Sequence, residues 1–595
     1  MTLDKYSVED LLQKRRGLRR KLAETEGLQP VRIAVLGGTT TNEVVDLLEL
    51  LLLAGGFRPE FYQSEYGRFY EDAVHDPADL IAFAPNIVYI HTCHLNVLSL
   101  PAPGCSEEEL KERVEAEHGR YVQIWKSIEQ HTQAQIIQNN FELPPHALLG
   151  NLDAVSSGGV YRFFLALNAE FARSAASDSR LMIQDVHGLS AQMGLRHWFD
   201  WDRYFSYKIL TTIEGSFAMA SSLASMVRAI YGKSCKVLVL DLDNTLWGGV
   251  IGDDGVDKIQ LGRETPVAES YTAFQEYCVG LWRRGVLLAV CSKNNEEIAR
   301  QGFEHPDSVL KLTHFSCFKA NWEPKHENIL AIAKELNLGA DSFVFVDDNP
   351  AERAIVEAQV GGIAVPDVGS EVSRFAAIIE AGRYFEPVSM TAEDLSRAAL
   401  YESNTARASM EAKFANYGEY LDSLEMTAEI ERFKPLYIER IAQLTNKTNQ
   451  FNLTTRRYSL AEMEAVLDDS RYIGLYGKLS DRFGDNGLIS VVLGRREDDD
   501  LHLDLWLMSC RVLKRGVEVA MLDVLVQQAR DAGIAALLGY YLPTNKNAMV
   551  ADHYEKLGFE RVTTGSTAEA STWKLDVSNY TPRSAHIKIM EPVYG

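Results

Sequence analysis

Short apolar runs alternate along most of the chain with longer stretches of helical periodicity. The first series of apolar runs lies at residues 31–36, 87–90 and 134–138. The second lies at residues 236–240, 286–290, 313–318, 342–346 and 362–365. Strands that alternate with helices form parallel sheets covered on both faces. The pattern therefore predicts two successive α/β domains.

The last part of the chain has a different pattern. Four β-like segments, at 426–432, 473–479, 487–493 and 501–508, precede a helix at 516–532 and a strand at 535–541. We also expect a charged helix at 5–28 and a helical stretch at 391–420. The predicted fold class is multidomain α/β. Its divisions are an N-terminal helix (1–30), two α/β domains (31–225 and 226–385), a helical connector (386–424) and a third α/β domain (425–595).

Composition narrows the classes of partner. The 595 residues include 60 basic and 83 acidic side chains, and the net charge is −23. Such a surface repels nucleic acids and anionic membranes, so we expect neither as a partner. The seven cysteines form no Cys-x-x-Cys pair, and the chain opens without a signal-peptide pattern. We therefore expect reduced thiols and a cytoplasmic location.

The most informative residues follow the apolar strands of the second series. Asp241-Leu-Asp243 comes directly after one strand, Ser292 ends the next, and Asp347-Asp348 follows a third. Open α/β sheets bind ligands at the carboxyl ends of their strands. Asp-x-Asp-x-Thr alone occurs by chance in acidic chains. The same motif after an apolar strand, with Ser, Lys and Asp-Asp in order, predicts a phosphoryl-handling site.

Each of these groups suits a step of phosphoryl transfer. Asp241 would be the nucleophile, and Asp243 would protonate the leaving oxygen and later deprotonate water. Crowded carboxylates beside a phosphate require a hard cation, so Mg²⁺ is the predicted cofactor. Its expected ligands are Asp241, Asp243 through its carbonyl, Asp347 and Asp348. Lys325 is expected to be catalytic, and the expected phosphate-binding residues are Thr245, Ser292, Lys293 and Asn294.

The amino-acid sequences of three segments resemble those of a known family. Leu-Asp-Leu-Asp-Asn-Thr-Leu-Trp-Gly-Gly-Val at 240–250, Asn-Trp-Glu-Pro-Lys at 321–325 and the segment 443–457 are similar to FkbH-type proteins of the haloacid dehalogenase superfamily, class IIIC. That resemblance implies a Rossmann-like domain. It also implies a glyceryl transferase/phosphatase that takes a three-carbon unit from 1,3-bisphosphoglycerate and loads it on the phosphopantetheine thiol of an acyl carrier protein for polyketide-type biosynthesis.

Cys291 gives that reaction a candidate thiol. It precedes Ser292 at a strand end, where it could attack an acyl phosphate and hold the acyl group as a thioester. The alternative is a small buried residue that closes the strand. About 45 residues separate Asp243 from Ser292, which leaves no room for a full cap domain beside the helix and strand. The site is therefore expected to stay open to a large partner, with a short glycine-rich flap.

The flanking domains carry weaker resemblances. Gly37-Gly38-Thr39 after a strand resembles the first block of SGNH hydrolases, which have a flavodoxin-like fold, and Gly67 and Asn139 fall near that fold's oxyanion positions. We find no convincing catalytic Asp-x-x-His motif before residue 225, so a non-catalytic domain is expected. Residues 547–559 match the late helix and turn of a GNAT acetyltransferase, and the third domain resembles that fold. Its phosphate-loop position supplies the candidate pantetheine contacts Arg511, Lys514, Arg515 and Gly516.

Three functions stay open at this stage. The first is the glyceryl transferase/phosphatase, with an acyl carrier protein and a phosphorylated three-carbon substrate as partners. The second is a Mg²⁺-dependent small-molecule phosphomonoesterase. The third is a carrier-docking scaffold with a vestigial site. The intact Asp241, Asp243, Ser292, Lys325 and Asp347 set counts against the scaffold.

Overall fold

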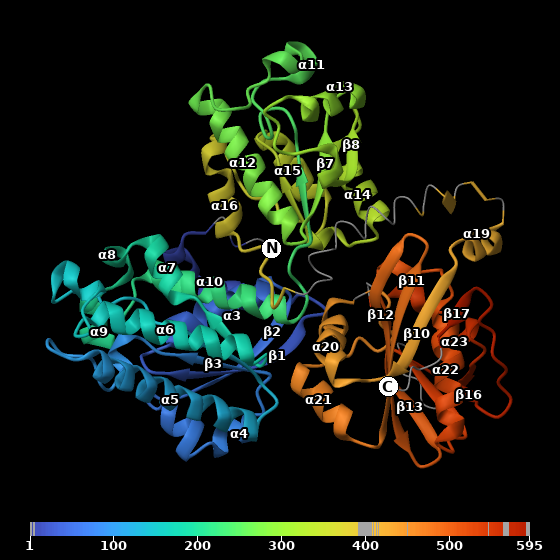
Figure 1. Ribbon diagram of the computed structural model, residues 1–595, viewed down its shortest axis with the longest axis horizontal. Coiled ribbons are helices and arrows are strands. Elements are labelled where there is room, and N and C mark those ends of the chain that lie inside the picture. The colour runs from blue at the N-terminus through green and yellow to red at the C-terminus, as the bar shows by residue number, and fades with distance from the viewer. Residues whose placement is uncertain are drawn as a thin grey trace. The chain divides into compact units, whose positions relative to one another are not determined.

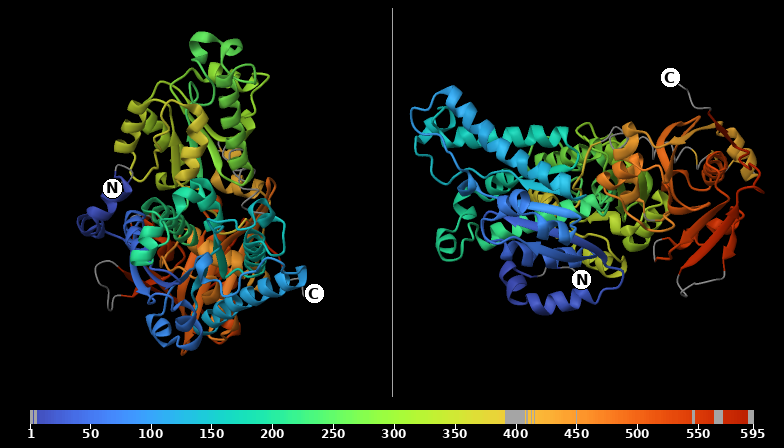
Figure 2. Two further views of the ribbon diagram at one scale, coloured as in Figure 1. Left: turned by 90° about the vertical axis from the view of Figure 1, so that its left-hand side faces the viewer. Right: turned by 90° about the horizontal axis from the view of Figure 1, so that it is seen from below.

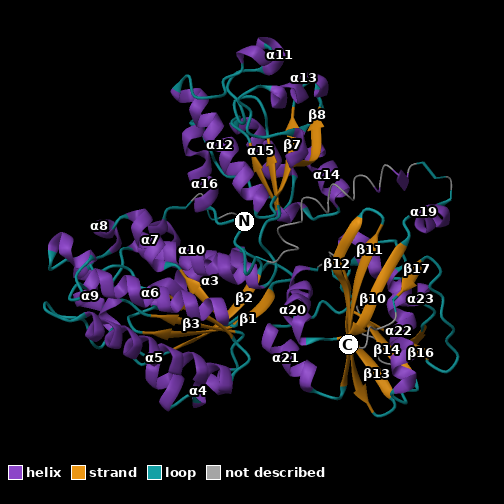
Figure 3. Cartoon of the chain, in the orientation of Figure 1, coloured by secondary structure: helices purple, strands orange, loops and turns teal. Residues whose placement is uncertain are grey.

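The computed structural model describes residues 3, 6–390, 407, 410–411, 413–414, 416–448, 450–544, 547–562 and 570–590. Its strands form three separate sheets (Figures 1 and 3). Two compact units contain them, residues 1–228 with 458–464 and residues 229–457 with 465–595. These sheets confirm a multidomain α/β fold. Most of the predicted connector, 386–424, lies outside the described residues.

The first sheet is parallel throughout, in the order β2-β1-β3-β4-β5. This is the flavodoxin-like doubly wound order. Helices lie on both faces of the sheet (Figure 2). The strands are β1 (Gln29–Gly37), β2 (Phe57–Gln63), β3 (Ile87–His91), β4 (Gln135–Asn139) and β5 (Leu181–Gln184). The helices are α1 (Val8–Gln13), α2 (Arg15–Ala23), α3 (Asn42–Ala54), α4 (Ala78–Phe83), α5 (Glu107–His131), α6 (Val160–Ser177), α7 (Val186–Met193), α8 (Leu195–Trp198), α9 (Trp201–Tyr207) and α10 (Ile213–Ile230).

The single charged helix expected at 5–28 is two helices. Helix α1 ends at Gln13 and α2 begins at Arg15, so Lys14 belongs to neither helix. The prediction of one continuous helix was wrong. The Lys14 backbone, at φ −91° and ψ 2°, lies outside the helical range and separates α1 from α2. Two of its arginines, Arg15 and Arg19, form ion pairs with Asp46 and Glu49 of α3. Part of this charged segment therefore packs against α3 within the unit.

The second sheet has four parallel strands in the order β8-β7-β6-β9. They are β6 (Val237–Leu240), β7 (Leu287–Ser292), β8 (Phe315–Ala320) and β9 (Phe343–Val346). The surrounding helices are α11 (Ile251–Asp254), α12 (Pro266–Arg283), α13 (Glu296–Gln301), α14 (Lys325–Leu336), α15 (Pro350–Gln359) and α16 (Phe375–Ala381). A strand was expected at 362–365. This segment pairs with β9 at a single position, an isolated bridge between Val344 and Ala364.

Both faces of this second sheet are buried. Leu238, Leu240 and Val290 pack in one apolar cluster with residues of α12 and α16. Val239, Ala289 and their neighbours pack in another with α14 and α15. Burial on two faces explains why β6, β7 and β9 are continuous apolar runs and why they were predicted from sequence.

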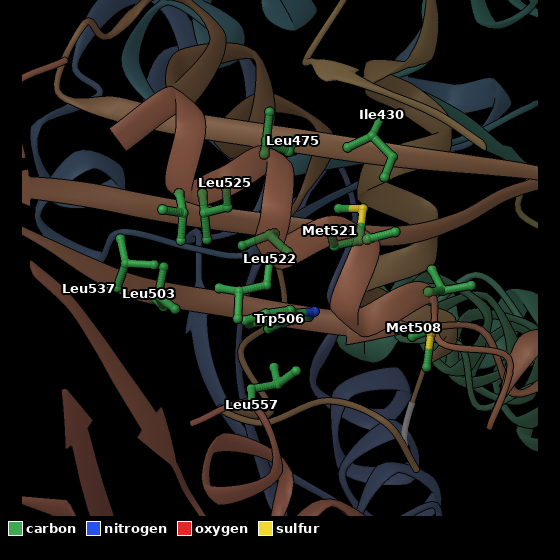
Figure 4. Close-up of a cluster of buried hydrophobic side chains, with 14 of the residues drawn as sticks. Ile430, Leu475, Leu503, Trp506, Met508, Met521, Leu522, Leu525, Leu537 and Leu557 are labelled. Atoms are coloured by element: carbon green, nitrogen blue, oxygen red, sulfur yellow. The ribbon is translucent and has the colours of Figure 1, made fainter. Parts of the chain in front are cut away.

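The third sheet is mixed, in the order β15-β16-β14-β13-β12-β11-β10-β17. Figure 4 shows part of its core, where helix α22 packs on the strands through Met521, Leu522 and Leu525. Its strands are β10 (Met426–Arg432), β11 (Tyr472–Asp481), β12 (Gly484–Glu497), β13 (Asp500–Met508), β14 (Ala536–Tyr541), β15 (Glu560–Val562), β16 (Ser571–Asp576) and β17 (Ile587–Ile589). Its helices are α19 (Tyr417–Ser423), α20 (Ile438–Lys447), α21 (Leu460–Asp468), α22 (Val517–Asp531) and α23 (His553–Lys556).

Strands β13 and β14 pair only over their first residues. They are parallel, and the register runs from Asp500–Ala536 to Leu503–Gly539. Beyond it, the segment 451–454 lies between the two strands. The Leu453 amide donates to the carbonyl of Trp506 at 3.1 Å, and the Leu542 amide donates to the carbonyl of Leu453 at 2.9 Å. This segment therefore satisfies backbone groups that the diverging strands leave unpaired.

Among the described residues, no helix is long and apolar enough to cross a lipid bilayer.

Candidate metal and phosphoryl site

Three strand ends of the second sheet carry the candidate site. Asp241 follows β6, Ser292 ends β7, and Asp347 follows β9. Strand β6 lies between β7 and β9, so these residues meet at one edge of the sheet. Lys325 is the first residue of α14. All four are buried.

Lys325 joins two of the carboxylates. Its Nζ lies 3.0 Å from Oδ2 of Asp241 and 2.6 Å from Oδ2 of Asp347. Burial and the charge of Asp241 raise the pKa of Asp347 to about 6. Burial alone would lower the pKa of Lys325, but the charges of Asp241 and Asp347 outweigh it and raise that pKa. The ammonium therefore stays charged and holds the carboxylates in place.

A divalent cation fits the same residues. One carboxylate oxygen from each of Asp241, Asp347 and Asp348 lies within 4.8 Å of the other two. Oδ1 of Asp241 is buried and accepts no hydrogen bond within the described part of the chain. A buried carboxylate oxygen without a partner is costly, and a cation or an incoming phosphoryl group would satisfy it. Oxygen donors of this kind suit Mg²⁺.

The carboxylate of Asp243 accepts hydrogen bonds from neutral donors. Its Oδ1 accepts from Nε1 of Trp247 at 2.8 Å and from the amide of Ile251 at 3.1 Å. Its Oδ2 accepts from Nδ2 of Asn294 at 2.9 Å. Burial raises the pKa of Asp243. A carboxyl group with a raised pKa is suited to giving up a proton and taking it back.

The predicted phosphate-binding residues have different surroundings. Thr245 shares hydrogen bonds with Asp348: its Oγ1 accepts from the Asp348 amide at 3.2 Å. Asn294 is engaged with Asp243, as described above. Lys293 is 2.6 Å from Oε1 of Glu352 on α15, so the structure pairs its ammonium with a carboxylate. Ser292 is 2% exposed and its carbonyl accepts from the Asn321 amide at 3.1 Å.

Cys291 lies in the apolar cluster beneath α14. It is fully buried, with Ile329 and Ile332 in the same cluster, and its Sγ is 3.5 Å from the carbonyl oxygen of Lys325. Burial raises the pKa of this thiol, as do the charges of Asp241 and Asp347. Because the thiolate is the nucleophile, these surroundings count against an acyl-carrying role in this conformation. That role stays a prediction.

The insert after Asp243 is small. It contains the four-residue helix α11 and a bridge between Gly248 and Gln260. The Trp247 ring packs against Phe303 at 5.3 Å between centroids and lies against Gly302, where an added Cβ would meet the ring at 2.7 Å. The insert is thus anchored on the domain by Trp247, and it places Trp247 and Ile251 on Asp243.

The candidate pantetheine contacts of the third domain are largely engaged with their own chain. Arg515 is 7% exposed and lies 3.0 Å from Asp481, which also pairs with Arg407. The carbonyl of Lys514, a residue with φ +64°, accepts from the hydroxyl of Tyr417 at 2.9 Å. Arg511 donates through Nε to Oγ of Ser509 at 3.1 Å, and Gly516 is the left-handed residue before α22. These contacts within the protein do not test binding of pantetheine, so the pantetheine contact stays a prediction.

The contact of the His91 side chain with Thr39 in the first domain was not predicted from the sequence. Nε2 of His91, the last residue of β3, lies 3.0 Å from Oγ1 of Thr39. The sequence signal would have been a histidine at the end of an apolar strand beside β1. The two residues expected near the oxyanion positions donate hydrogen bonds to backbone carbonyls. The Gly67 amide donates to the carbonyl of Gly37, and Nδ2 of Asn139 donates to the carbonyl of Thr92.

The chain is similar to solved structures, although no protein-family model and no curated protein sequence matches it. The N-terminal part of the protein BF1531 from Bacteroides fragilis contains a phosphatase domain and was solved in complex with Mg. It is 29% identical, with a TM-score of 0.58, and the match covers 63% of this chain and 99% of that one.

Two acetyltransferase structures match a smaller part. The ribosomal-protein-S18-alanine N-acetyltransferase from Escherichia coli is 16% identical with a TM-score of 0.21, over 27% of this chain and 99% of that one. The GNAT domain of S. lividans PAT is 16% identical with a TM-score of 0.22, over 25% of this chain and 90% of that one.

Proposed function

We propose that the second α/β domain is a Mg²⁺-dependent phosphatase that acts by way of Asp241. The observation that carries this proposal is the geometry of Asp241: Lys325 holds one carboxylate oxygen, while the other is buried and free to react within the described site. The magnesium complex of the phosphatase-containing BF1531 structure supports the same chemistry.

The residues suggest the order of steps. Oδ1 of Asp241 attacks phosphorus, and Asp243 gives its proton to the departing oxygen. Asp243 then takes a proton from the water that hydrolyses the aspartyl phosphate. Asp241, Asp347 and Asp348 would hold Mg²⁺, which neutralises charge on the phosphoryl oxygens when bound. Lys325 fixes the orientation of Asp241 throughout.

We further propose that the substrate is a phosphorylated three-carbon unit destined for an acyl carrier protein. The resemblance of residues 240–250, 321–325 and 443–457 to FkbH-type proteins supports this, and so does the small insert after Asp243. An insert of this size leaves space for a prosthetic arm. A plain phosphomonoesterase is the second candidate, and the burial of Cys291 favours it.

One reaction separates the candidates. The full chain is incubated with Mg²⁺, 1,3-bisphosphoglycerate and a phosphopantetheinylated carrier, and both phosphate release and carrier mass are measured. A mass gain of one glyceryl unit on the carrier supports the transferase, whereas phosphate release without a gain supports the phosphomonoesterase. The isosteric variant Asp241→Asn should lower phosphate release by about a thousandfold or more.

Cys291→Ala tests the thiol within the same assay. If Cys291 carries the acyl group, this variant releases phosphate but loads no carrier. If Cys291 only fills the core beneath α14, loading persists and the variant is destabilised by about 1 kcal/mol. Phosphate release that Asp241→Asn leaves intact would exclude the proposed phosphatase.

A further inference from the structure

An exposed tryptophan lies beside the proposed phosphoryl site. Trp322 belongs to the loop 321–324, which follows β8 and leads into α14 at Lys325. In the register of β7 and β8, Ser292 pairs with the residue directly before this loop, and Nζ of Lys325 lies 3.0 Å from Asp241. We propose, on the basis of the transferase function proposed above, that Trp322 binds the pantetheine arm of the carrier while the thiol at its end reaches the site.

The exposure of Trp322 sets it apart from the other tryptophans. It is 76% exposed, whereas the other seven tryptophans of the chain are buried or partly buried. An indole offers a large, rigid apolar surface, and tryptophan is enriched where binding partners make their main contacts. Its exposure beside a reactive site therefore indicates a surface kept free for a ligand.

Hydrogen bonds fix the loop that carries Trp322. The side-chain amides of Asn321 and Asn328 donate to each other at 3.1 and 2.8 Å. The Glu323 amide donates to Oδ1 of Asn321 at 3.0 Å, and the Asn321 amide donates to the carbonyl of Ser292 at 3.1 Å. The exposed indole therefore belongs to a defined conformation of the loop. A contact surface organised in advance loses little freedom when a ligand binds.

A second apolar side chain is exposed on the other side of β7. Val250 is 39% exposed and precedes Ile251, whose amide donates to Oδ1 of Asp243 at 3.1 Å. Strand β7 lies between β6 and β8, so the insert after β6 and the loop after β8 flank its end. Val250 and Trp322 thus form an apolar rim. Such a rim suits an uncharged ligand better than a phosphate.

The width of the sheet argues for a long ligand. Neighbouring strands lie about 4.8 Å apart, so β8 is about 10 Å from β6, the strand that positions Asp241. One extended residue, with three backbone atoms, spans about 3.5 Å, and a three-carbon chain is of similar length. Held at Asp241 through its phosphate, such a unit covers only part of the distance to the loop of Trp322. The prosthetic arm of a carrier is long enough to cover the rest.

The charges near Trp322 also favour an arm of this chemistry. Glu323 follows Trp322 directly, Glu327 lies in the first turn of α14, and both are exposed. Their carboxylates repel phosphate groups. The pantetheine chain is uncharged between its thiol and its phosphate, and its methyl and amide groups pack on an indole face. A quaternary ammonium is the alternative ligand for an indole near carboxylates.

Quenching of tryptophan fluorescence by acrylamide tests binding at Trp322 directly. The probe is pantetheine with a methylated thiol, added to the full-length protein with Mg²⁺. Because Trp322 is the most exposed tryptophan, acrylamide acts mainly on it. We expect the probe to lower the quenching constant of the wild type and to leave that of Trp322→Ala unchanged. Protection of Trp322 by choline but not by the probe would overturn the proposal.

Carrier loading measures the same contact during the reaction. With Mg²⁺ and 1,3-bisphosphoglycerate, Trp322→Ala should raise KM for the phosphopantetheinylated carrier by about tenfold, with a smaller effect on kcat. Trp322→Phe keeps an aromatic face and should stay within about threefold of the wild-type KM.

Leu330→Ala is the matched control for these variants. Leu330 is a 48% exposed apolar residue of α14 outside the apolar rim. Its replacement should change neither the KM for the carrier nor the quenching. An unchanged KM in a folded Trp322→Ala protein, or an equal rise in Leu330→Ala, would contradict the role of Trp322.

The two measurements separate the role of Trp322 from the transferase function on which it rests. If the wild type loads no carrier, the transferase function fails, and the quenching experiment alone decides whether Trp322 binds the arm. If the wild type loads the carrier but the probe does not protect Trp322, the transferase function stands and the role of Trp322 is refuted.

Discussion

Asp241 and Asp243 are two residues apart, yet their surroundings prepare them for different tasks. Asp241 faces a buried ammonium, with Nζ of Lys325 3.0 Å from one of its carboxylate oxygens. Within the described part of the chain, Asp243 accepts from an indole, a backbone amide and a side-chain amide, and burial raises its pKa. Pairs of carboxyl groups with environments of this kind divide the nucleophilic and acidic roles between them.

Another buried residue gives a pH-dependent prediction. Burial lowers the pKa of His553 from 6.5 to about 3, and rings of Trp506 and Phe451 lie 4.7 and 5.0 Å from it. The unfolded chain takes up this proton first as the pH falls, so stability is complete above pH 6.5 and is lost progressively below it. At pH 5 the loss should be about 2 kcal/mol relative to pH 7.5.

Thermal unfolding with His553→Phe as the comparison isolates this effect. The variant keeps an aromatic ring but has no titrating group at this position. The free energy of unfolding of the wild type minus that of the variant should therefore fall by about 2 kcal/mol from pH 7.5 to pH 5. A difference that is the same at both pH values would show that His553 is protonated in the folded protein.

At the scale of elements, the side chain of Asn547 joins the segment 451–454 to the end of β14. Asn547 is fully buried, and its Nδ2 donates to the carbonyls of Asn452 and Leu542 at 2.9 and 3.0 Å. Asn547→Ala would leave both carbonyls buried without this donor. Each such loss costs about 1–3 kcal/mol, so we expect about 2–4 kcal/mol in total and faster amide exchange at Leu453.

An exposed asparagine supplies the control for that variant. Nδ2 of Asn579 donates to Oδ2 of Asp576 at 3.0 Å on the surface. Asn579→Ala should change the unfolding temperature little, because water replaces the lost bond. Equal destabilisation by the two variants would mean that Asn547 does not hold the segment.

The elements also show what the sequence could and could not predict. Strands β6, β7 and β9 were predicted because burial on both faces makes them continuous apolar runs. The edge strand β2 was missed because most of its residues are partly exposed, so its pattern is not strand-like. The Asp241 site could be predicted because its residues lie at the ends of apolar strands. The Thr39–His91 pair could not be predicted, because it depends on which strands are neighbours in the sheet.

At the scale of the whole molecule, charge governs the approach of a phosphorylated substrate. The net charge is −23. The proposed site itself adds no attraction. Its four carboxylates exceed the combined charge of Lys325 and one Mg²⁺ by a single negative charge, and the charges balance when Asp243 is protonated. An anion therefore meets repulsion at a distance, and the site adds no net attraction to offset it.

Salt should therefore speed the capture of an anionic substrate. Raising the ionic strength from about 0.01 M to about 0.15 M shortens the screening length from about 30 Å to about 8 Å. With Mg²⁺ held at saturation, kcat/KM for p-nitrophenyl phosphate should rise by up to about tenfold as KCl is added, while kcat stays constant. Screening changes the rate at which the substrate meets the enzyme and leaves the buried contacts of Lys325 unchanged. The rise in kcat/KM should therefore come from a lower KM. A fall in kcat/KM with added salt would instead reveal a local basic surface that attracts the substrate against the net charge.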